Sequence, residues 1–244
     1  MTSLSSARLF ETLLLTTRVP MHTQRLSPQW KQSSSAPIVQ KLDGVSWLNV
    51  DPLLLGACFQ HALDAAGEGE IENYHGGGLR RYLGAHYTSR ENAIKVIEPL
   101  FLNDLAARAQ SADPALLDDI RELTFLDPAV GAAAFLVVIY EELRRIENSL
   151  LADGERSGIT LDQFFGIEVS PDAALVARLA LQLARLRADD QYGDSPPAEP
   201  TITVGNALRV EWADTVPAKN CSYIVGNPPF RGALKMTREQ KADM

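Results

Sequence analysis

The sequence feature that most constrains the fold is a series of four short apolar runs, each of which ends in polar residues. The runs are rich in β-branched and aromatic residues and lie within 123–131, 164–169, 201–207 and 223–226. After each of the first two runs, apolar residues recur at helical spacing, over 132–151 and 172–187. Strands that alternate with helices indicate an α/β fold with a doubly wound, mostly parallel sheet.

A polar residue stands at the end of each expected strand. In chain order these residues are Asp127, Glu168, Asn206 and Asn227. Ligands of open α/β sheets bind at the carboxyl ends of the strands, which all lie at one edge when the strands are parallel. We therefore expect these four side chains to share one site.

The last of these strands ends in Asn227, Pro228, Pro229 and Phe230. Two adjacent prolines fix two φ angles and remove two backbone donors, and the residue before the first proline is held extended. The Asn227 oxygen and nearby carbonyls can then converge on one amino group, while the aromatic ring stacks on the base that carries it. The alternative is a proline-rich turn that closes a buried strand.

The other strand ends also fit a ligand site. Glu168 is an acid that can bond both hydroxyls of a ribose, and it can equally serve the helix that starts after Ser170 and Pro171. Asn206 can contact an adenine edge or act as a turn residue. The segment from Asp127 to Gly131 is expected to bend the chain against a ligand before the next helix begins.

In their order these segments resemble an N6-adenine DNA methyltransferase of the gamma arrangement, and in particular the methyltransferase part of MmeI-like type II restriction–modification enzymes. The resemblance covers Trp47 to Met244. The similar motifs lie at 127–135, 165–168, 205–209 and 226–230, with a further cofactor motif at 83–89 followed by a helix from Arg90 to about Ala109.

The resemblance implies an incomplete Rossmann-like domain that transfers a methyl group from S-adenosylmethionine to adenine N6 in DNA, within a restriction–modification system. DNA, with the target adenine flipped out, is the implied partner. No metal and no covalent enzyme intermediate are implied. The implied catalytic residues are Asn227, Pro228, Pro229 and Phe230. The implied cofactor-binding residues are Tyr87, Thr88, Asp127, Ala129, Gly131, Phe135, Glu168, Asn206 and Ala207.

The chain departs from the family pattern in its first cofactor loop. Only Gly131 remains of the usual glycines, and it is followed by Ala132, Ala133 and Ala134. Alanine at a position that needs positive φ is strained, and three alanines favour an early start of the helix. We expect a weakened affinity for the cofactor.

The family pattern also includes three more strands and a target-recognition domain after the catalytic motif. We therefore expect this sequence to be the front part of a methyltransferase. Two alternatives follow: an inactive truncated remnant, and a cofactor-binding subunit completed by a second, downstream chain. Glu239 and Lys241 have the spacing of a nuclease motif, but they lie in a polar tail without a strand, so no restriction activity is expected.

Composition limits the remaining possibilities. The net charge of −8 argues against tight independent DNA binding, although a locally basic cleft could use Arg209, Arg231, Lys235 and Arg238. Two cysteines far apart suggest a reducing, cytoplasmic location. No apolar run is long enough for a membrane span. We expect three regions: a basic, Ser-rich leader at 1–45, a helical segment and flexible linker at 46–82, and the methyltransferase part at 83–244.

Overall fold

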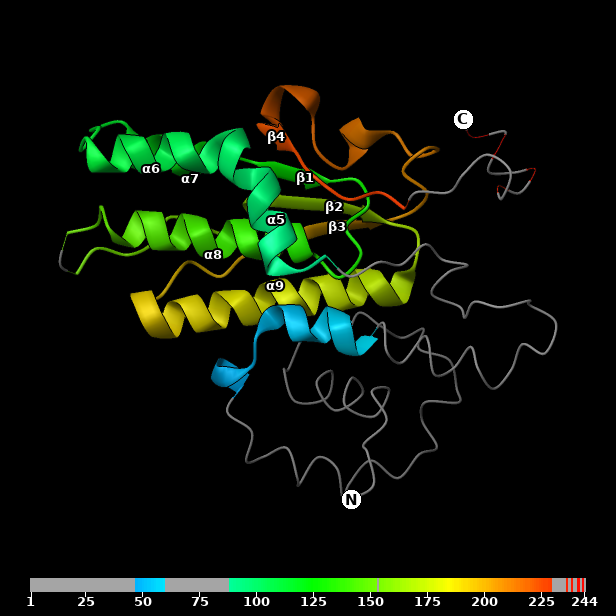
Figure 1. Ribbon diagram of the computed structural model, residues 1–244, viewed down its shortest axis with the longest axis horizontal. Helices are drawn as coiled ribbons and strands as arrows, with labels where there is room; N and C mark the ends of the chain where they lie inside the picture. Colours follow the sequence, from blue (N-terminus) through cyan, green and yellow to red (C-terminus); the bar gives the residue numbers. More distant parts are fainter. Residues whose placement is uncertain are drawn as a thin grey trace, which may run out of the picture.

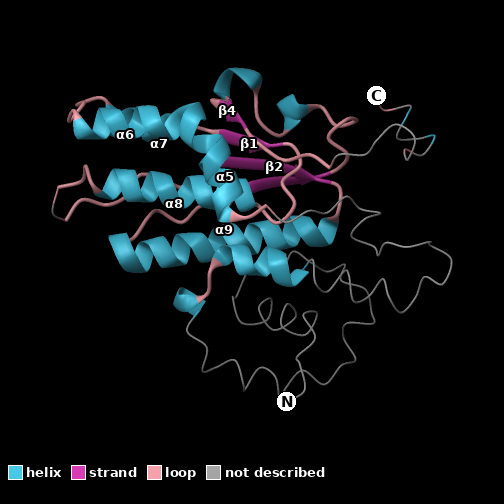
Figure 2. Ribbon diagram, viewed as in Figure 1, coloured by secondary structure: helices cyan, strands magenta, loops and turns pink. Residues whose placement is uncertain are grey.

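The structure is a computed structural model that describes residues 47–59, 88–152 and 154–229, together with residues 236, 238, 241 and 243. Its centre is a parallel sheet in the order β3-β2-β1-β4. The strands are β1 (Phe125–Asp127), β2 (Phe164–Glu168), β3 (Thr201–Val204) and β4 (Tyr223–Ile224). All pairings are parallel, with Asp127 opposite Gly166 and Glu168 opposite Val204. The predicted parallel α/β sheet is thus confirmed (Figures 1 and 2).

Helices accompany the sheet along one face. The long helices α8 (Ala134–Asn148) and α9 (Pro171–Tyr192) run beside each other and follow β1 and β2 (Figure 1). Between residue 90 and β1 the helices are α5 (Arg90–Ile97), η3 (Glu98–Leu102), α6 (Asn103–Gln110) and α7 (Leu116–Glu122). Residues 52–59 are helical, and the short 3-10 turns are η2 (Trp47–Asn49), η4 (Leu161–Gln163), η5 (Trp212–Asp214) and η6 (Ala218–Asn220). No helix in these described segments has the length and hydropathy of a bilayer span.

Local sequence explains where the helices start and how one of them is interrupted. The Ser170 hydroxyl accepts a hydrogen bond from the Ala173 amide, and Pro171 occupies the first turn of α9. The expected helix after Arg90 is present, but it contains a π-helical turn at η3. Pro99 lies in this turn and lacks an N–H, which is a common cause of such an irregularity.

Alternate strand residues build the core on both faces of the sheet. Phe125 and Phe164 lie on the helix-covered face, with ring centroids 5.5 Å apart, and Phe101 from η3 packs on Phe125. Leu126 and Ile167 point to the opposite face, where they pack with Val216. Because side chains alternate along each strand, both faces of the sheet are covered by packed residues, and the direction of each strand-end side chain is fixed.

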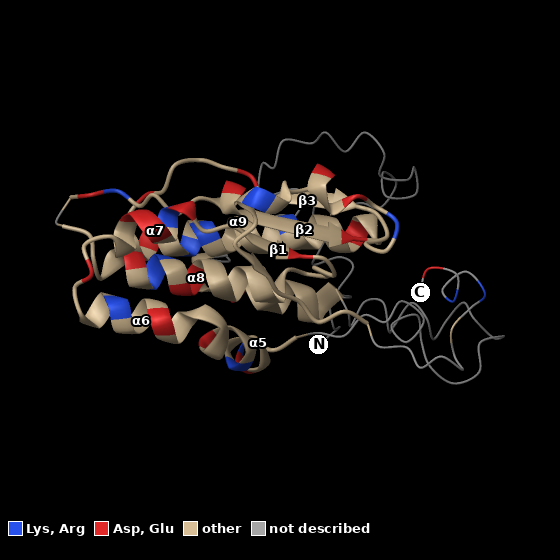
Figure 3. Ribbon diagram, turned by 90° about the horizontal axis from the view of Figure 1, so that it is seen from above, with Lys and Arg blue, Asp and Glu red and all other residues tan. Residues whose placement is uncertain are grey.

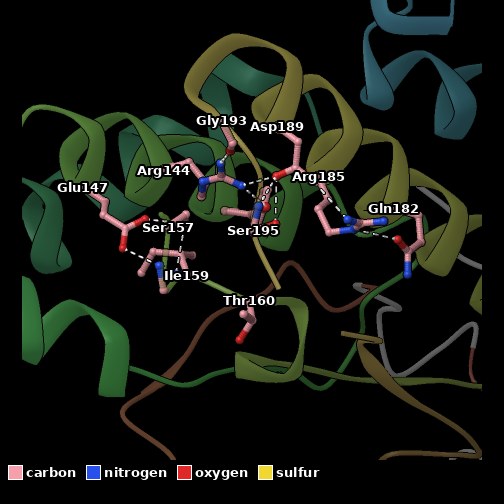
Figure 4. A network of polar contacts seen from close by, with 12 residues as sticks. Arg144, Glu147, Ser157, Ile159, Thr160, Gln182, Arg185, Asp189, Gly193 and Ser195 are labelled. Carbon is pink, nitrogen blue, oxygen red and sulfur yellow. Dashed lines mark hydrogen bonds and ion pairs between the residues drawn. The ribbon is translucent and has the colours of Figure 1, made fainter. Parts of the chain in front are cut away.

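A buried polar network joins α8 and α9 at the ends remote from the carboxyl ends of the strands (Figure 4). The Arg144 side chain, only 1% exposed, donates hydrogen bonds to the Tyr140 hydroxyl, the Asp189 carboxylate and the Gly193 carbonyl at 2.7–2.8 Å. One turn further, buried Glu147 accepts from Arg121 of α7 at 2.9 Å. Such a buried ion pair is stable because each charged group is matched by hydrogen bonds.

Candidate active site

A cavity of about 480 Å³ lies at the carboxyl ends of the strands. Every predicted site residue that the structure describes lines this cavity. These residues are Thr88, Asp127, Ala129, Gly131, Phe135, Glu168, Asn206, Ala207, Asn227, Pro228 and Pro229. Tyr87 and Phe230 lie outside the described residues. The parallel sheet therefore brings together four polar strand-end residues that are far apart in the sequence.

Asp127 ends β1 and is almost completely buried. Its Oδ1 accepts a hydrogen bond from the Ala129 amide at 2.9 Å. Burial raises the pKa of the Asp127 carboxyl to about 7, against the lowering effect of that hydrogen bond. A Cβ atom at Gly226 would lie 2.5 Å from Asp127 Oδ1, so the carboxyl group packs directly against the strand-end glycine that precedes Asn227.

Glu168 joins the two loops that follow β1 and β2. One of its oxygens accepts from the Gly131 amide and the other from the Ser170 amide, both at 2.9 Å. Each carboxylate oxygen has a second lone pair, so the same group can still accept hydrogen bonds from a ligand. The two interpretations of Glu168, as a helix-start acid and as a ligand acceptor, are therefore geometrically compatible.

The alanine-rich loop does not begin the helix early, contrary to the sequence expectation. Residues 131–133 form a turn, and α8 starts only at Ala134. Gly131 has φ 52° and Ala133 has φ 63°, which is the left-handed region that disfavours alanine. Two hydrogen bonds stabilise this turn, one from the Gly131 amide to Glu168 and one from the Ala133 amide to the Val130 carbonyl. Residues 131–133 therefore do not extend the helix.

Asn206, after β3, forms the turn that the sequence also allowed. Its side-chain oxygen accepts from the Leu208 amide at 3.0 Å, and its Nδ2 donates to Asp243 at 3.2 Å. Arg209 also pairs with Asp243 at 2.8 Å, and this pairing lowers the pKa of the Asp243 carboxyl. A residue close to the carboxyl end of the chain thus contacts the β3 rim of the cavity.

Asn227 lies exposed at the cavity, after β4. Its Nδ2 faces the hydroxyl of Thr88 across 3.5 Å, which is a long hydrogen bond. Thr88 is buried and comes from the segment just before α5. Thr88 lies on the donor side of the amide, and the acceptor oxygen of Asn227 has no hydrogen-bond donor among the described residues, so it can accept from a ligand.

Several cavity residues were not predicted from the sequence. Val169 and Leu208 are 61% and 64% exposed and follow predicted strand-end residues closely. In the sequence, both could have been recognised as cavity residues because each is an apolar residue at a position where the chain leaves the sheet. Phe59 and Trp212 also line the cavity, and no local pattern marks them, since they come from a distant helix and a 3-10 turn.

Several charged side chains of the fold form ion pairs, among them Arg90 with Glu141 and Arg121 with Glu147. Acidic and basic residues lie next to one another along α6, α7 and α8 (Figure 3). Of the predicted basic cleft residues, Arg209 is paired with Asp243 and Arg238 is exposed, whereas Arg231 and Lys235 lie outside the described residues. Within the described part of the chain, no group of three or more His, Cys, Asp or Glu side chains is arranged to hold a metal ion.

The fold is that of a parallel α/β protein with a cavity at the carboxyl ends of the strands. Residues 105–244 match the family described as MmeI, DNA-methyltransferase domain. The chain belongs to this family.

Comparisons with individual proteins agree with this assignment. A DNA methyltransferase A of Bacillus subtilis (strain 168) is 33% identical over 242 residues, covering 88% of this chain and 26% of the relative. A type II restriction enzyme and methyltransferase of Methanocaldococcus jannaschii is 31% identical over 128 residues, covering 46% of this chain and 11% of its own length.

A solved structure also resembles the fold. The Type IIL restriction–modification enzyme MmeI, determined in complex with DNA, superposes with a TM-score of 0.71 at 31% identity. The alignment covers 97% of this chain and 36% of the MmeI chain. The present chain thus spans about a quarter of its Bacillus relative and about a third of MmeI.

Proposed function

We propose that this domain transfers a methyl group from S-adenosylmethionine to the N6 amino group of adenine in DNA, as part of a restriction–modification system. The observation that carries the proposal is the position of Asn227. Its side chain lies at the rim of the cavity that also contains Asp127, Glu168 and Asn206, and no residue that the structure describes donates a hydrogen bond to its acceptor oxygen. The names of the relatives, which include DNA methyltransferases and restriction–modification enzymes, support the same reaction class.

Asn227 and Pro228 account for the activation of the target amine. The adenine amino nitrogen is a weak nucleophile because its lone pair is delocalised into the ring. When Asn227 Oδ1 and the Pro228 carbonyl accept its two protons in hydrogen bonds, the lone pair localises and points away from them. This is catalysis by positioning and electrostatics, and the base must leave the duplex to reach the cavity.

The cofactor supplies an electrophilic methyl group on a sulfonium centre. The residues present fit such a ligand, because the cavity combines apolar walls with acceptor groups at the strand ends. Glu168 keeps lone pairs for the ribose hydroxyls while it holds the Gly131 loop. Asn206 and Ala207 border the end of the cavity beside β3, where an adenine edge would lie.

A methyl-transfer assay tests this proposal. The full chain is incubated with tritiated S-adenosylmethionine and mixed-sequence DNA, and the digested product is analysed for N6-methyladenine. Asn227→Ala should abolish incorporation, whereas Asn92→Ala, at an exposed site on α5, should retain it. Methylation found only on cytosine, or incorporation that survives in Asn227→Ala, would contradict the proposal.

A second candidate is a cofactor-binding subunit that acts only together with a downstream chain. One observation favours it: β4 is the last strand of the described sheet, and its Ile224 side chain is 56% exposed. A further strand beside β4 would cover that edge. Co-expression with the product of the adjacent reading frame distinguishes this candidate, because it predicts methyl transfer only by the two chains together. Cofactor binding without transfer under either condition would instead indicate an inactive remnant.

A further inference from the structure

Phe59 contributes to the cavity from a part of the chain that the family match does not include. It is the last described residue of the 52–59 helix, whereas the match begins at residue 105. Its half-buried side chain lines the cavity together with Val169 and Leu208. The cavity wall therefore combines an element outside the matched region with the loops at the strand ends.

The 52–59 helix is held firmly at its other end. Asp51 Oδ1 accepts a hydrogen bond from the Leu53 amide at 3.0 Å, which caps the first turn. Leu53 and Leu55 are buried in the main core. Because a helix rises about 1.5 Å per residue, Phe59 lies roughly 12 Å along the axis from this anchored end.

Two partly exposed arginines connect the residues just before this helix to α5, α8 and α9. Arg187 of α9 donates a hydrogen bond to the Leu48 carbonyl at 3.0 Å. Arg90 of α5 lies 3.6 Å from Asp51 and 2.6 Å from Glu141 of α8. These contacts place the helix before any ligand arrives, and a pre-placed wall lowers the ordering cost of binding.

We propose that Phe59 is a cofactor-binding residue, so that the 52–59 helix completes the S-adenosylmethionine site from outside the matched methyltransferase region. This inference depends on the proposed function. A phenylalanine ring can pack on the flat adenine or face the sulfonium cation, and both contacts are favourable. In either case the ring removes apolar ligand surface from water.

Isothermal titration with S-adenosylmethionine tests the assignment on the full chain. Phe59→Ala should weaken binding by about tenfold, which corresponds to about 1.4 kcal/mol, and Phe59→Leu should weaken it less because apolar volume is kept. The matched control is Leu54→Ala, on the same helix but 51% exposed, which should bind as the wild type does. Far-ultraviolet circular dichroism verifies that each variant is folded.

Titration with S-adenosylhomocysteine separates the two contacts. If Phe59→Ala weakens only the binding of the charged S-adenosylmethionine, the ring faces the sulfonium. If it weakens the binding of both ligands equally, the ring packs on the adenosine. If Phe59→Leu and Phe59→Ala both bind S-adenosylmethionine within twofold of the wild type, the assignment of Phe59 is wrong and the proposed function is unaffected. A wild-type chain that binds no S-adenosylmethionine overturns both.

Discussion

The charged side chains near the two ends of α8 and α9 have different kinds of partner. At the remote end, Arg144 and Asp189 form a buried ion pair supported by a hydroxyl and a carbonyl group (Figure 4). At the cavity end, neither Asp127 nor Glu168 forms an ion pair with any described residue. Their partners are backbone amides instead, so no side chain in the described part of the chain neutralises either carboxyl group.

This difference separates a structural use of buried polar groups from a ligand-binding use. A fully paired network holds two helices in one register and has no capacity for another partner. A carboxyl group that accepts only from backbone amides keeps lone pairs for a ligand. The remote network thus fixes the helices, and the carboxyl groups at the cavity end can still accept hydrogen bonds from a ligand.

The largest expected effect comes from breaking the remote network. Arg144→Met removes the buried cation and its three hydrogen bonds, although Asp189 keeps its ion pair with Arg185 at 3.0 Å, so the free energy of unfolding should fall by about 3 kcal/mol. Urea denaturation measures this loss. The matched control is Arg145→Met, whose side chain is 59% exposed and should cost under about 1 kcal/mol. Equal losses in the two variants would mean that the buried pair has no special role.

The next effect concerns the raised pKa of Asp127. A carboxyl whose pKa is about 7 in the folded chain and near its ordinary value when unfolded favours folding while it is protonated. Its contribution is therefore greatest below the unfolded pKa and declines as the pH rises toward about 7. Relative to Asp127→Asn, the wild type should lose stability between pH 5 and pH 7, with little further change above about pH 8.

Urea midpoints across this pH range measure the difference. Asp118→Asn, at an exposed position on α7, provides the control and should track the wild type at every pH. Parallel stability profiles for the wild type and Asp127→Asn would show that Asp127 does not titrate in this range.

A smaller effect is expected for Glu168→Gln. The amide can accept from only one of the Gly131 and Ser170 amides, so the variant should lose about 1–3 kcal/mol of stability. We also expect about tenfold weaker binding of S-adenosylmethionine, equal to about 1.4 kcal/mol, because one ribose acceptor is lost. Titration calorimetry measures the binding, and the control is Glu91→Gln, at an exposed position on α5. Unchanged affinity would assign Glu168 to loop structure alone.

The smallest effect is the relief of the left-handed alanine in the cavity loop. Ala133→Gly relieves this strain but also removes a fully buried methyl group, so it should change the stability by under about 1 kcal/mol, and it should bind S-adenosylmethionine more tightly because glycine adopts positive φ without strain. Ala112 has φ 52° in the remote turn after α6, where it is exposed, and provides a comparison without a buried methyl group. Ala112→Gly should therefore give the full stability gain of about 1 kcal/mol and no change in affinity. Micromolar binding by the wild type would contradict the expected weakening by the alanine loop.

The sequence predicted the features that depend on period and direction. Strands alternating with helices required a parallel sheet, and parallel strands brought Asp127, Glu168 and Asn227 to one edge. Features set by tertiary packing were not predictable. The left-handed turn at Ala133 depends on the bond between Gly131 and Glu168, and Phe59 reaches the cavity through packing that no local pattern encodes.

The close contact between Asp127 and Gly226 has a consequence for how related sequences can diverge. A side chain at position 226 and the Asp127 carboxyl would occupy the same space, since a Cβ there would approach within 2.5 Å of the oxygen. A change at either position is therefore constrained by the other, although the two are almost one hundred residues apart in the sequence. We expect the pair to covary among descendants: a larger residue at 226 should be inherited together with a shorter one at 127.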